Sequence, residues 1–477
     1  MKLGKSLLLG TAAAIVATAG AQAADLPSRK AAPVAYVKVC DAYGAGFFYI
    51  PGTETCVKIG GRVRADYAFS GNTELYSNGT FNGATGARIN TVSTPERAIN
   101  NYGWEARGRV DLDARTPTAW GTVQTDLALL LSRNSGTLEL AGPGFESTSA
   151  SPTLEAAYIR FAGFTFGAAR DNFAFMPSTF YGAGHWGSFA NGAKQLAYTA
   201  VLGGGLSATV AIQDMTDTTV NGGSGGESTR DYFGIGTFGY VYNNLPQLNG
   251  RVDLEQAWGT VSVMGAVGKA VAANTTAPAV DLDKTVWAVG AGVKINLPML
   301  AAGDVLWLNA AYADGMTEYT TNWTYNKGSD TSVNVGGFRR NHPSWVIGGD
   351  ALTGPRIETL KSWNVAAVFS HYWTPAIRHS FLATYGQIDG TRSSRFATFG
   401  AGGGGIGDAT VWNVGTQLAW LPVRNFEIGV EVLYARVESD VRRIVTTAGG
   451  GLLVGDTIVT REKDSNWTGR LRVERTF

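Results

Sequence analysis

Charged and apolar residues alternate strictly along two segments of this chain, and this alternation limits the fold more than any other feature. After Cys56, the charged residues Arg62, Arg64 and Asp66 lie at even positions between apolar or small residues. Residues 104–115 repeat the pattern with the opposite parity, because every odd position from 105 onward carries a charge. Successive side chains of a β-strand point to opposite faces. Each segment is therefore predicted to be a strand with one charged face and one apolar face.

The density of charge on one face separates a membrane sheet from a soluble sheet. In a soluble sandwich the apolar faces pack against each other and the polar faces meet water. Here charges of both signs recur on strand after strand, while the other face carries small and aromatic residues. A transmembrane barrel inverts the soluble arrangement, with lipid outside and water inside, and its closure satisfies every backbone hydrogen bond. The sequence therefore predicts an all-β protein, a transmembrane antiparallel β-barrel.

The connections between the predicted strands alternate in length, which gives the strand number. Short connections are predicted at residues 116–119, 162–163, 203–205, 259, 297–303, 374–375 and 422–425. Long ones are predicted near 70–100, 134–152, 172–194, 216–247, 269–283, 319–361, 389–409 and 439–465. Seven short turns and eight long external loops connect 16 strands, an even number that leaves room for an aqueous channel.

The composition agrees with a large β structure in a membrane. The chain has 63 Gly, 13 Trp, 18 Tyr and 21 Phe. Tryptophans near the predicted strand ends suit an aromatic girdle at the membrane interface; they are Trp104, Trp120, Trp258, Trp363, Trp373, Trp412 and Trp420. The formal net charge is +1, which argues against a nucleic-acid partner because such proteins usually carry a basic face.

The N-terminal residues have the pattern of a secretory signal peptide. Lys2 and Lys5 precede an apolar run from Leu7 to Ala19, and Ala21-Gln22-Ala23 is an A-x-A cleavage site. We expect a signal peptide over 1–23, an N-terminal periplasmic segment over 24–55 and the barrel over 56–477. The expected location is the outer membrane of a Gram-negative bacterium, which the chain crosses many times.

The two cysteines, Cys40 and Cys56, are predicted to form a disulfide. Export would place them in an oxidising compartment, where pairing is the default. The bond would close a loop of about 15 residues and contribute about 3 kcal/mol in the chain-entropy treatment. A zinc site is the alternative, but two cysteines supply only half of the ligands. We expect no metal and no cofactor.

Residues 39–67 carry a family resemblance. They read VCDAYGAGFFYIPGTETCVKIGGRVRADY and are similar to the start of the alphaproteobacterial general porins of rhizobia, brucellae and their relatives. Matching positions are the two cysteines, the run from Tyr43 to Thr53, Gly60-Gly61, Arg64 and Tyr67. Weaker similarity continues to the C-terminus. The resemblance implies a homotrimer of 16-stranded barrels, with the third long loop folded into each pore, and passive diffusion of small hydrophilic solutes and ions without enzymatic chemistry.

The third long loop, about residues 171–194, is the expected pore constriction by this resemblance. It is rich in aromatic side chains, which suit a loop packed against the barrel wall, and Asp171 is its only carboxylate. Many general porins have an acidic loop at this place. This loop departs from that composition, so the resemblance does not imply a preference for cations. An aromatic loop also leaves open a substrate-selective channel, for example for sugars.

The first, second and last strands become neighbours when the barrel closes, and their charges are the candidates for the pore wall. Opposed charges across a constriction create a field that tunes ion selectivity; simple mutual pairing of the charges is the alternative. The predicted pore residues are Arg62, Arg64, Asp66, Arg107, Arg109, Asp111, Asp113, Asp171, Arg470, Arg472 and Glu474.

The last strand ends on Phe477, which resembles the terminal aromatic signal of outer-membrane barrels. The expected partners are thus the barrel-assembly machinery, outer-membrane lipid and lipopolysaccharide, and other copies of the chain.

Gly182 to Gly187 match a dinucleotide fingerprint, but no βαβ unit surrounds them. An outer-membrane enzyme or a plugged structural barrel remain alternatives of a different class.

Overall fold

The structure is a computed structural model. It describes residues 38–70, 79–81, 88–91, 102–136, 151–177, 179–181, 193–214, 245–273, 281–320, 345–350, 354–391, 405–446 and 452–477. The predicted signal peptide lies outside these residues, as does residue 24 to residue 37 of the predicted periplasmic segment.

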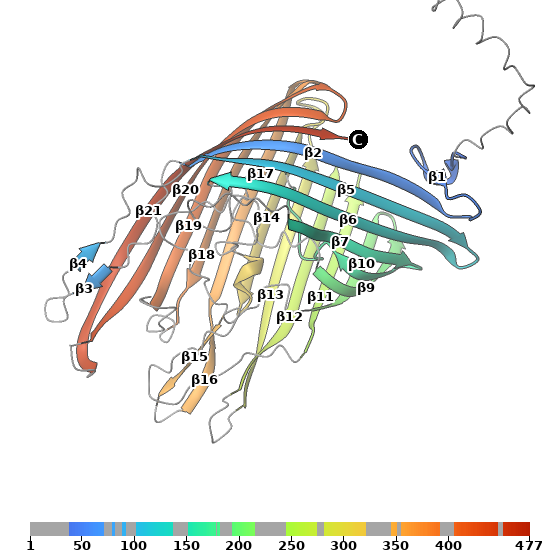
Figure 1. The fold of residues 1–477 in the computed structure, drawn as a ribbon. Coiled ribbons are helices and arrows are strands. Elements are labelled where there is room, and N and C mark those ends of the chain that lie inside the picture. Colours follow the sequence, from blue (N-terminus) through green and yellow to red (C-terminus); the bar gives the residue numbers. More distant parts are fainter. Residues whose placement is uncertain are drawn as a thin grey trace, which may run out of the picture. The chain divides into compact units, whose positions relative to one another are not determined.

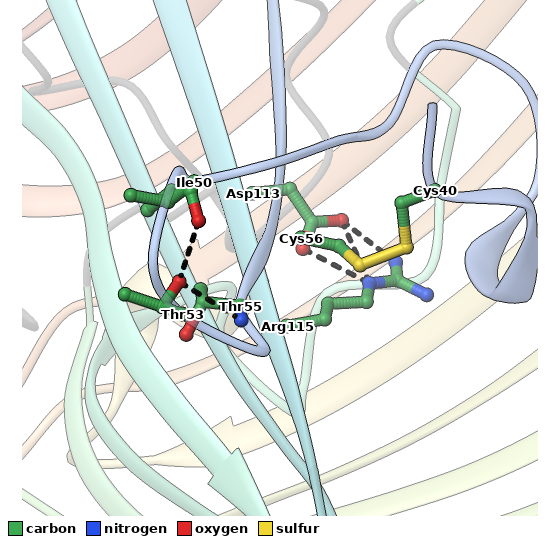
Figure 2. Close-up of a disulfide and its surroundings, with 7 residues drawn as sticks. All are labelled: Cys40, Ile50, Thr53, Thr55, Cys56, Asp113 and Arg115. Atoms are coloured by element: carbon green, nitrogen blue, oxygen red, sulfur yellow. Dashed lines mark hydrogen bonds and ion pairs between the residues drawn. A yellow bond between two sulfur atoms is a disulfide. The ribbon is translucent and has the colours of Figure 1, made fainter. Parts of the chain in front are cut away.

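The chain divides into two units, Met1–Val57 and Lys58–Phe477. In the described part of the first unit, a disulfide joins Cys40 to Cys56 across a sequence separation of 16 (Figure 2). The 3-10 helix η2 (Asp41–Tyr43) lies in the loop that the disulfide closes, and strand β1 (Phe48–Tyr49) pairs with the first residues of β2. Thr53 tightens the intervening turn, because its hydroxyl donates to the carbonyl of Ile50 (Figure 2). The predicted disulfide is confirmed.

The second unit is built from long antiparallel strands (Figure 1). The strands of its main sheet are β2 (Cys56–Ser70), β5 (Tyr102–Thr118), β6 (Gly121–Gly136), β7 (Ser151–Phe161), β8 (Phe164–Ala169), β9 (Ala193–Gly203), β10 (Leu206–Gln213), β11 (Gln247–Gln256), β12 (Gly259–Ala273), β13 (Asp281–Asn296), β14 (Val305–Asp314), β17 (Lys361–Thr374), β18 (Ile377–Asp389), β19 (Gly405–Val423), β20 (Phe426–Thr446) and β21 (Leu452–Thr476). Outside the main sheet are the hairpins β3 (Gly79–Phe81) with β4 (Arg88–Thr91) and β15 (Trp345–Asp350) with β16 (Gly354–Thr359), and the 3-10 helix η4 (Thr317–Tyr319).

The main sheet closes on itself because β2 pairs with both β21 and β5. Figure 1 shows this seam, where the blue β2 runs beside the red C-terminal strand. Over the described residues the sheet contains 17 strands, one of which is β1 of the first unit, so the barrel itself has sixteen. The predicted 16-stranded antiparallel barrel is confirmed. We find no helix among the described residues that is long and apolar enough to cross a bilayer.

Backbone bonds from the C-terminal residue complete the seam. The amide of Phe477 donates to the carbonyl of Gly61 at 2.9 Å, and the amide of Gly61 donates back to the carbonyl of Phe477 at 3.1 Å. Gly61 also lies against β5, where a Cβ on this residue would come within 2.3 Å of the carbonyl oxygen of Arg109. The glycine therefore permits β2 to approach both of its neighbours closely.

The two faces of each strand differ as the alternation predicts. On β2 an even-numbered charged residue, Arg64, is buried and its odd-numbered neighbour Val63 is exposed. On β5 the parity is reversed, since Glu105 is buried and Trp104 and Val110 are exposed. Large apolar side chains remain exposed on the same face of strand after strand around the barrel. An apolar face of this extent on a folded protein is suited to lipid and not to water.

Aromatic side chains mark the two ends of this apolar face. Trp120, Trp258, Trp373 and Trp420 lie in or beside short connections, and all four are exposed. Toward the long connections, the rings of adjacent strands contact each other, as in the chain of contacts formed by Trp412, Tyr434 and Trp467. The placement fits the interfacial girdle that the tryptophan positions predict, with aromatic rings at both ends of the apolar face.

The eighth long connection departs from the prediction. Residues 439–465 were expected to form a loop, but β20 and β21 continue to pair as far as Thr446 and Leu452. The two strands contain 21 and 25 residues. Pairing of this kind needs only backbone hydrogen bonds, so it does not depend on the alternation of charged and apolar residues from which the strands were predicted.

Candidate functional site

The described residues of the connection between β8 and β9, here called loop 3, fold back against the inner wall of the barrel. Residues 170–177 and 179–181 are described, and most of them are buried. Their contacts run from β9 to β11 through β13 and β14 to β19, β20 and β21. These strands occupy much of the circumference, so loop 3 lies inside the barrel and not above it.

Polar groups of β10 and β11 hold the beginning of loop 3. The carboxylate of Asp171, which is 2% exposed, accepts a hydrogen bond from the amide of Phe173 at 2.8 Å. It also accepts from the Asn249 side chain at 3.3 Å. Arg251 donates to the carbonyls of Asn172 at 3.3 Å and Ala174 at 2.8 Å. Asp171 therefore stabilises the turn that directs the loop inward, by accepting the hydrogen bond of a backbone amide in that turn.

Two glycines of β13 make room for the aromatic side chains of loop 3. A Cβ on Gly292 would lie 2.2 Å from the ring of Phe175, and a Cβ on Gly290 would lie 3.0 Å from the ring of Phe173. Phe175 also contacts Trp307 edge-on, with ring centroids 5.2 Å apart. The rings of the loop thus fill hollows that exist because these wall residues have no side chain.

The end of the described loop is held by β19, β20 and β21. The carbonyl of Thr179 accepts a hydrogen bond from Gln417 at 2.7 Å. The amide of Tyr181 donates to Glu431, and its hydroxyl donates to Glu427. Burial, and then the neighbouring Glu427 carboxylate, raise the pKa of Tyr181, so its phenol remains a donor.

Two arginines of β21 complete this attachment. Arg470 donates to the carbonyl of Tyr181 at 2.7 Å, and the guanidinium of Arg472 lies 4.4 Å from the centre of the Tyr181 ring. Both arginines also pair with Asp66 of β2, at 3.3 Å and 2.6 Å. The loop is therefore connected to the seam of the barrel through charged side chains.

A buried charge cluster extends from Asp66 across β2 and β5. Arg64 lies 3.9 Å from Asp66 and 3.1 Å from Glu105, which in turn pairs with Arg107 at 2.7 Å. All six members, Arg64, Asp66, Glu105, Arg107, Arg470 and Arg472, are at most 7% exposed. Charges that are this deeply buried require their partners, because isolated charges in a low dielectric are very costly.

A family profile described as "Porin subfamily" matches residues 25–466. The chain belongs to this porin family. Porin Omp2b of Brucella abortus (strain 2308) is 32% identical over 270 residues, which cover 54% of this chain and 64% of Omp2b. Omp2b of Brucella suis biovar 1 (strain 1330) is also 32% identical, over 271 residues. The chain therefore matches less than two thirds of the length of these curated relatives. The predicted relationship to the brucella-type porins is confirmed.

A solved structure supports the fold. The outer membrane channel DcaP of Acinetobacter baumannii matches with a TM-score of 0.56, at 18% identity, over 90% of this chain and 99% of DcaP. Together with the family membership, this fold makes the porin an outer-membrane β-barrel of a Gram-negative bacterium. Membership of a porin family also agrees with the expectation that the chain is not an enzyme.

A second group of inward charges, on β5 and β7, is partly exposed. Arg109 pairs with Asp111 at 2.7 Å and with Glu155 at 3.3 Å. Asp113 pairs with Arg115 at 2.7 Å (Figure 2). The Asp111 side chain is 42% exposed and the Arg109 side chain 26%. These groups can contact water and solutes inside the barrel, unlike the buried cluster.

The ten predicted pore residues on strands all lie on the inward face, but they separate into two groups. Arg64, Asp66, Arg107, Arg470 and Arg472 are buried, whereas Arg62, Arg109, Asp111, Asp113 and Glu474 are half-buried or exposed. Asp171 is buried and holds loop 3. Whether any of them controls permeation remains a prediction.

The sequence did not single out several residues that hold loop 3. They are Tyr319, Gln417, Glu427 and Glu431, together with Arg378, which donates to Glu427. The inward parity of β20 could have drawn attention to Glu427 and Glu431. Their partner Tyr181 lies about 250 residues away, as the separations of 246 and 250 show, and no local pattern links such positions.

Replacing Gly292 with alanine should displace loop 3 from the wall of this porin. The added methyl would overlap the ring of Phe175, so we expect the free energy of unfolding in urea to fall by about 1–3 kcal/mol. Gly250→Ala is the matched control, because a Cβ on this strand glycine would meet nothing within 4 Å. The unfolding free energy in lipid vesicles measures the difference, and equal values for the two variants would show that Phe175 does not depend on Gly292.

Proposed function

We propose that this porin is a passive diffusion pore of the outer membrane for small hydrophilic solutes and ions. The observation that supports the proposal most is the partly exposed charge of Arg109, Asp111 and Asp113 on the inward face of a closed barrel. Such side chains need water, whereas the outer face is apolar. Loop 3, attached to β11, β13, β14 and β19–β21, would act as the constriction.

The lumen should show weak ion selectivity. Many of the inward arginines have an acidic partner two residues away on the same strand. Examples are Arg109 with Asp111, Arg115 with Asp113 and Arg251 with Asp253, each pair at 2.7 Å. The fields of closely paired opposite charges largely cancel, and salt screens the remainder beyond a Debye length of about 8 Å. A small net field is left along the pore.

A sugar-selective channel is the second candidate, and the position of the aromatic rings argues against it. A selective sugar pathway would present a row of exposed aromatic faces to the solute. In the described part of loop 3, Phe173, Phe175 and Phe180 are at most 7% exposed. The rings of Phe173 and Phe175 lie against the wall at Gly290 and Gly292. These rings support the loop and do not line a pathway.

We also propose that the porin assembles as a homotrimer in a bilayer with lipopolysaccharide, after cleavage of a signal peptide over 1–23 and insertion by the barrel-assembly machinery. The segment 24–55 would then lie in the periplasm. The supporting observations are the family membership and the sequence pattern of the first 23 residues. Native mass spectrometry of the detergent-extracted porin measures the subunit number.

Single-channel recording in planar lipid bilayers tests the pore. We expect large ohmic steps, grouped in threes for a trimer, and a small reversal potential in a salt gradient. Liposome swelling should show sugar entry that depends on solute size and not on stereochemistry. Heat-modifiable, folded protein that conducts no ions would contradict the proposal.

Replacing Asp111 with asparagine should shift the selectivity toward anions. The change removes the partner of Arg109 that is most exposed to the lumen, so the chloride-to-potassium permeability ratio should rise roughly twofold. Asp283→Asn is the matched control. Its carboxylate also pairs with a cation, Lys269 at 2.8 Å, but it lies on the outward face of β13. Equal reversal potentials for both variants would remove Asp111 from the selectivity-determining set.

A further inference from the structure

The residues that follow β14 also fold into the barrel, and they belong to the sixth long connection. Met316, Thr317, Tyr319 and Thr320, in and around η4, are at most 3% exposed. The chain turns inward at Gly315, whose φ of 77° favours glycine. A Cβ at Gly315 would also lie 2.3 Å from the side chain of Val286 on β13. Both the backbone conformation and the close packing at this position therefore require a glycine for the inward turn.

Three kinds of contact fix this segment in place. The amide of Gly315 donates to the carbonyl of Leu360 at 2.9 Å. The hydroxyls of Thr320 and Ser362 are hydrogen-bonded at 2.5 Å, which ties the segment to β17. Leu360, where the sixth connection returns to the barrel, is fully buried.

Tyr319 joins this segment to loop 3. Its ring lies against Phe173, with centroids 4.3 Å apart, and Phe173 also lies against the wall at Gly290. The hydroxyl of Tyr319 accepts hydrogen bonds from Gln247 and from Asn249, the latter at 3.5 Å. The Asn249 amide is the same group that donates to Asp171.

We infer that Tyr319 is a positioning residue for the constriction loop, so that the pore is shaped by two inward segments, loop 3 and residues 315–320, and not by loop 3 alone. Phe173 is clamped between Gly290 and Tyr319, and Asp171 and Tyr319 share the amide of Asn249. The first arm of loop 3 therefore cannot leave the wall without displacing Tyr319. The inference rests on the proposed pore function for its effect on current, but the position of the loop can be measured separately.

Thiol labelling measures the position without any current. Ala174 lies in loop 3, is 4% exposed and has its carbonyl held by Arg251. Because Ala174 is buried, the thiol of Ala174→Cys should react slowly with a charged maleimide. The native cysteines should not react, because they are joined in a disulfide. Adding Tyr319→Ala should raise the labelling rate about tenfold, because an aromatic contact and two hydrogen bonds are lost. Adding Tyr319→Phe keeps the ring and should give an intermediate rate.

Tyr312→Phe is the matched control, because Tyr312 lies on β14 but its ring contacts Trp287 on the outward face. In bilayers, Tyr319→Ala should increase current fluctuations in the open channel, whereas Tyr312→Phe should match the wild type. If Tyr319→Ala fails to give heat-modifiable protein, Tyr319→Phe alone decides through its labelling rate. Labelling at the wild-type rate in both Tyr319 variants would overturn the inference. Faster labelling in a protein that never conducts would uphold the inference and contradict the pore.

Discussion

Replacing Gly61 with valine should prevent most of the protein from closing into a barrel. A Cβ at this position would lie 2.3 Å from the carbonyl oxygen of Arg109 and 3.0 Å from the ring of Phe477. The first obstacle is backbone of β5, which cannot rotate away as a side chain can. We therefore expect a loss at the upper end of the range for overpacking, about 3 kcal/mol.

Because Gly61 lies at the seam, the lost stability should affect the closure of the barrel. Its two backbone bonds with Phe477, at 2.9 and 3.1 Å, join the first strand to the end of the chain. A barrel that cannot close exposes unpaired backbone groups to lipid, where they find no partners. The measurement is the fraction of heat-modifiable protein after refolding into vesicles.

Gly108→Val is the matched control for this prediction. Gly108 lies on β5, next to Arg109, but a Cβ there would meet nothing within 4 Å. This variant should refold as the wild type does. If Gly61→Val and Gly108→Val refold equally well, close approach at the seam does not limit closure.

The strands of this porin could be predicted because their constraints are local. Arg64-Ala65-Asp66 and Arg109-Val110-Asp111 each place two charges on one face of a strand by parity alone. The same parity leaves Ala65 and Val110 on the lipid side. The alternation of short and long connections then gave the strand number without any knowledge of pairing.

The division of the charges could not be predicted, because it depends on what covers them. Arg107 and Arg109 lie two residues apart on β5 and have the same inward parity. Arg107 is nevertheless 5% exposed, whereas the side chain of Arg109 is 26% exposed. Burial arises from segments that are remote in the chain, such as Tyr181 over Arg472, and side-chain patterns carry no information about such contacts.

The second inward segment, residues 315–320, was missed for the same reason. Its signal is a glycine with positive φ, Gly315, followed by η4, and a sequence with 63 glycines contains many such candidates. Only the contact of Tyr319 with Phe173 shows that this turn points inward. The prediction of a single internal loop came from family resemblance, which does not describe the features of an individual chain.

Replacing Asp66 with asparagine should destabilise the barrel and loosen loop 3 together. The carboxylate pairs with Arg472 at 2.6 Å, Arg470 at 3.3 Å and Arg64 at 3.9 Å, and its side chain is fully buried. The amide has nearly the same shape but no charge, so three buried guanidinium groups lose their shared partner. Removing one partner of a buried charge pair costs about 3–5 kcal/mol, and urea unfolding in vesicles should show a loss of this size.

The same substitution should reach the constriction because Arg470 and Arg472 also hold Tyr181. We expect larger fluctuations of the open-channel current together with the lower stability. Asp113→Asn is the graded control, since its carboxylate has the side chain of Arg115 at 2.7 Å and is 21% exposed. For such a pair the expected loss is below about 1 kcal/mol. If Asp66→Asn costs no more than Asp113→Asn, the buried cluster does not stabilise the seam, and the attachment of loop 3 must depend on Glu431 and Gln417 instead.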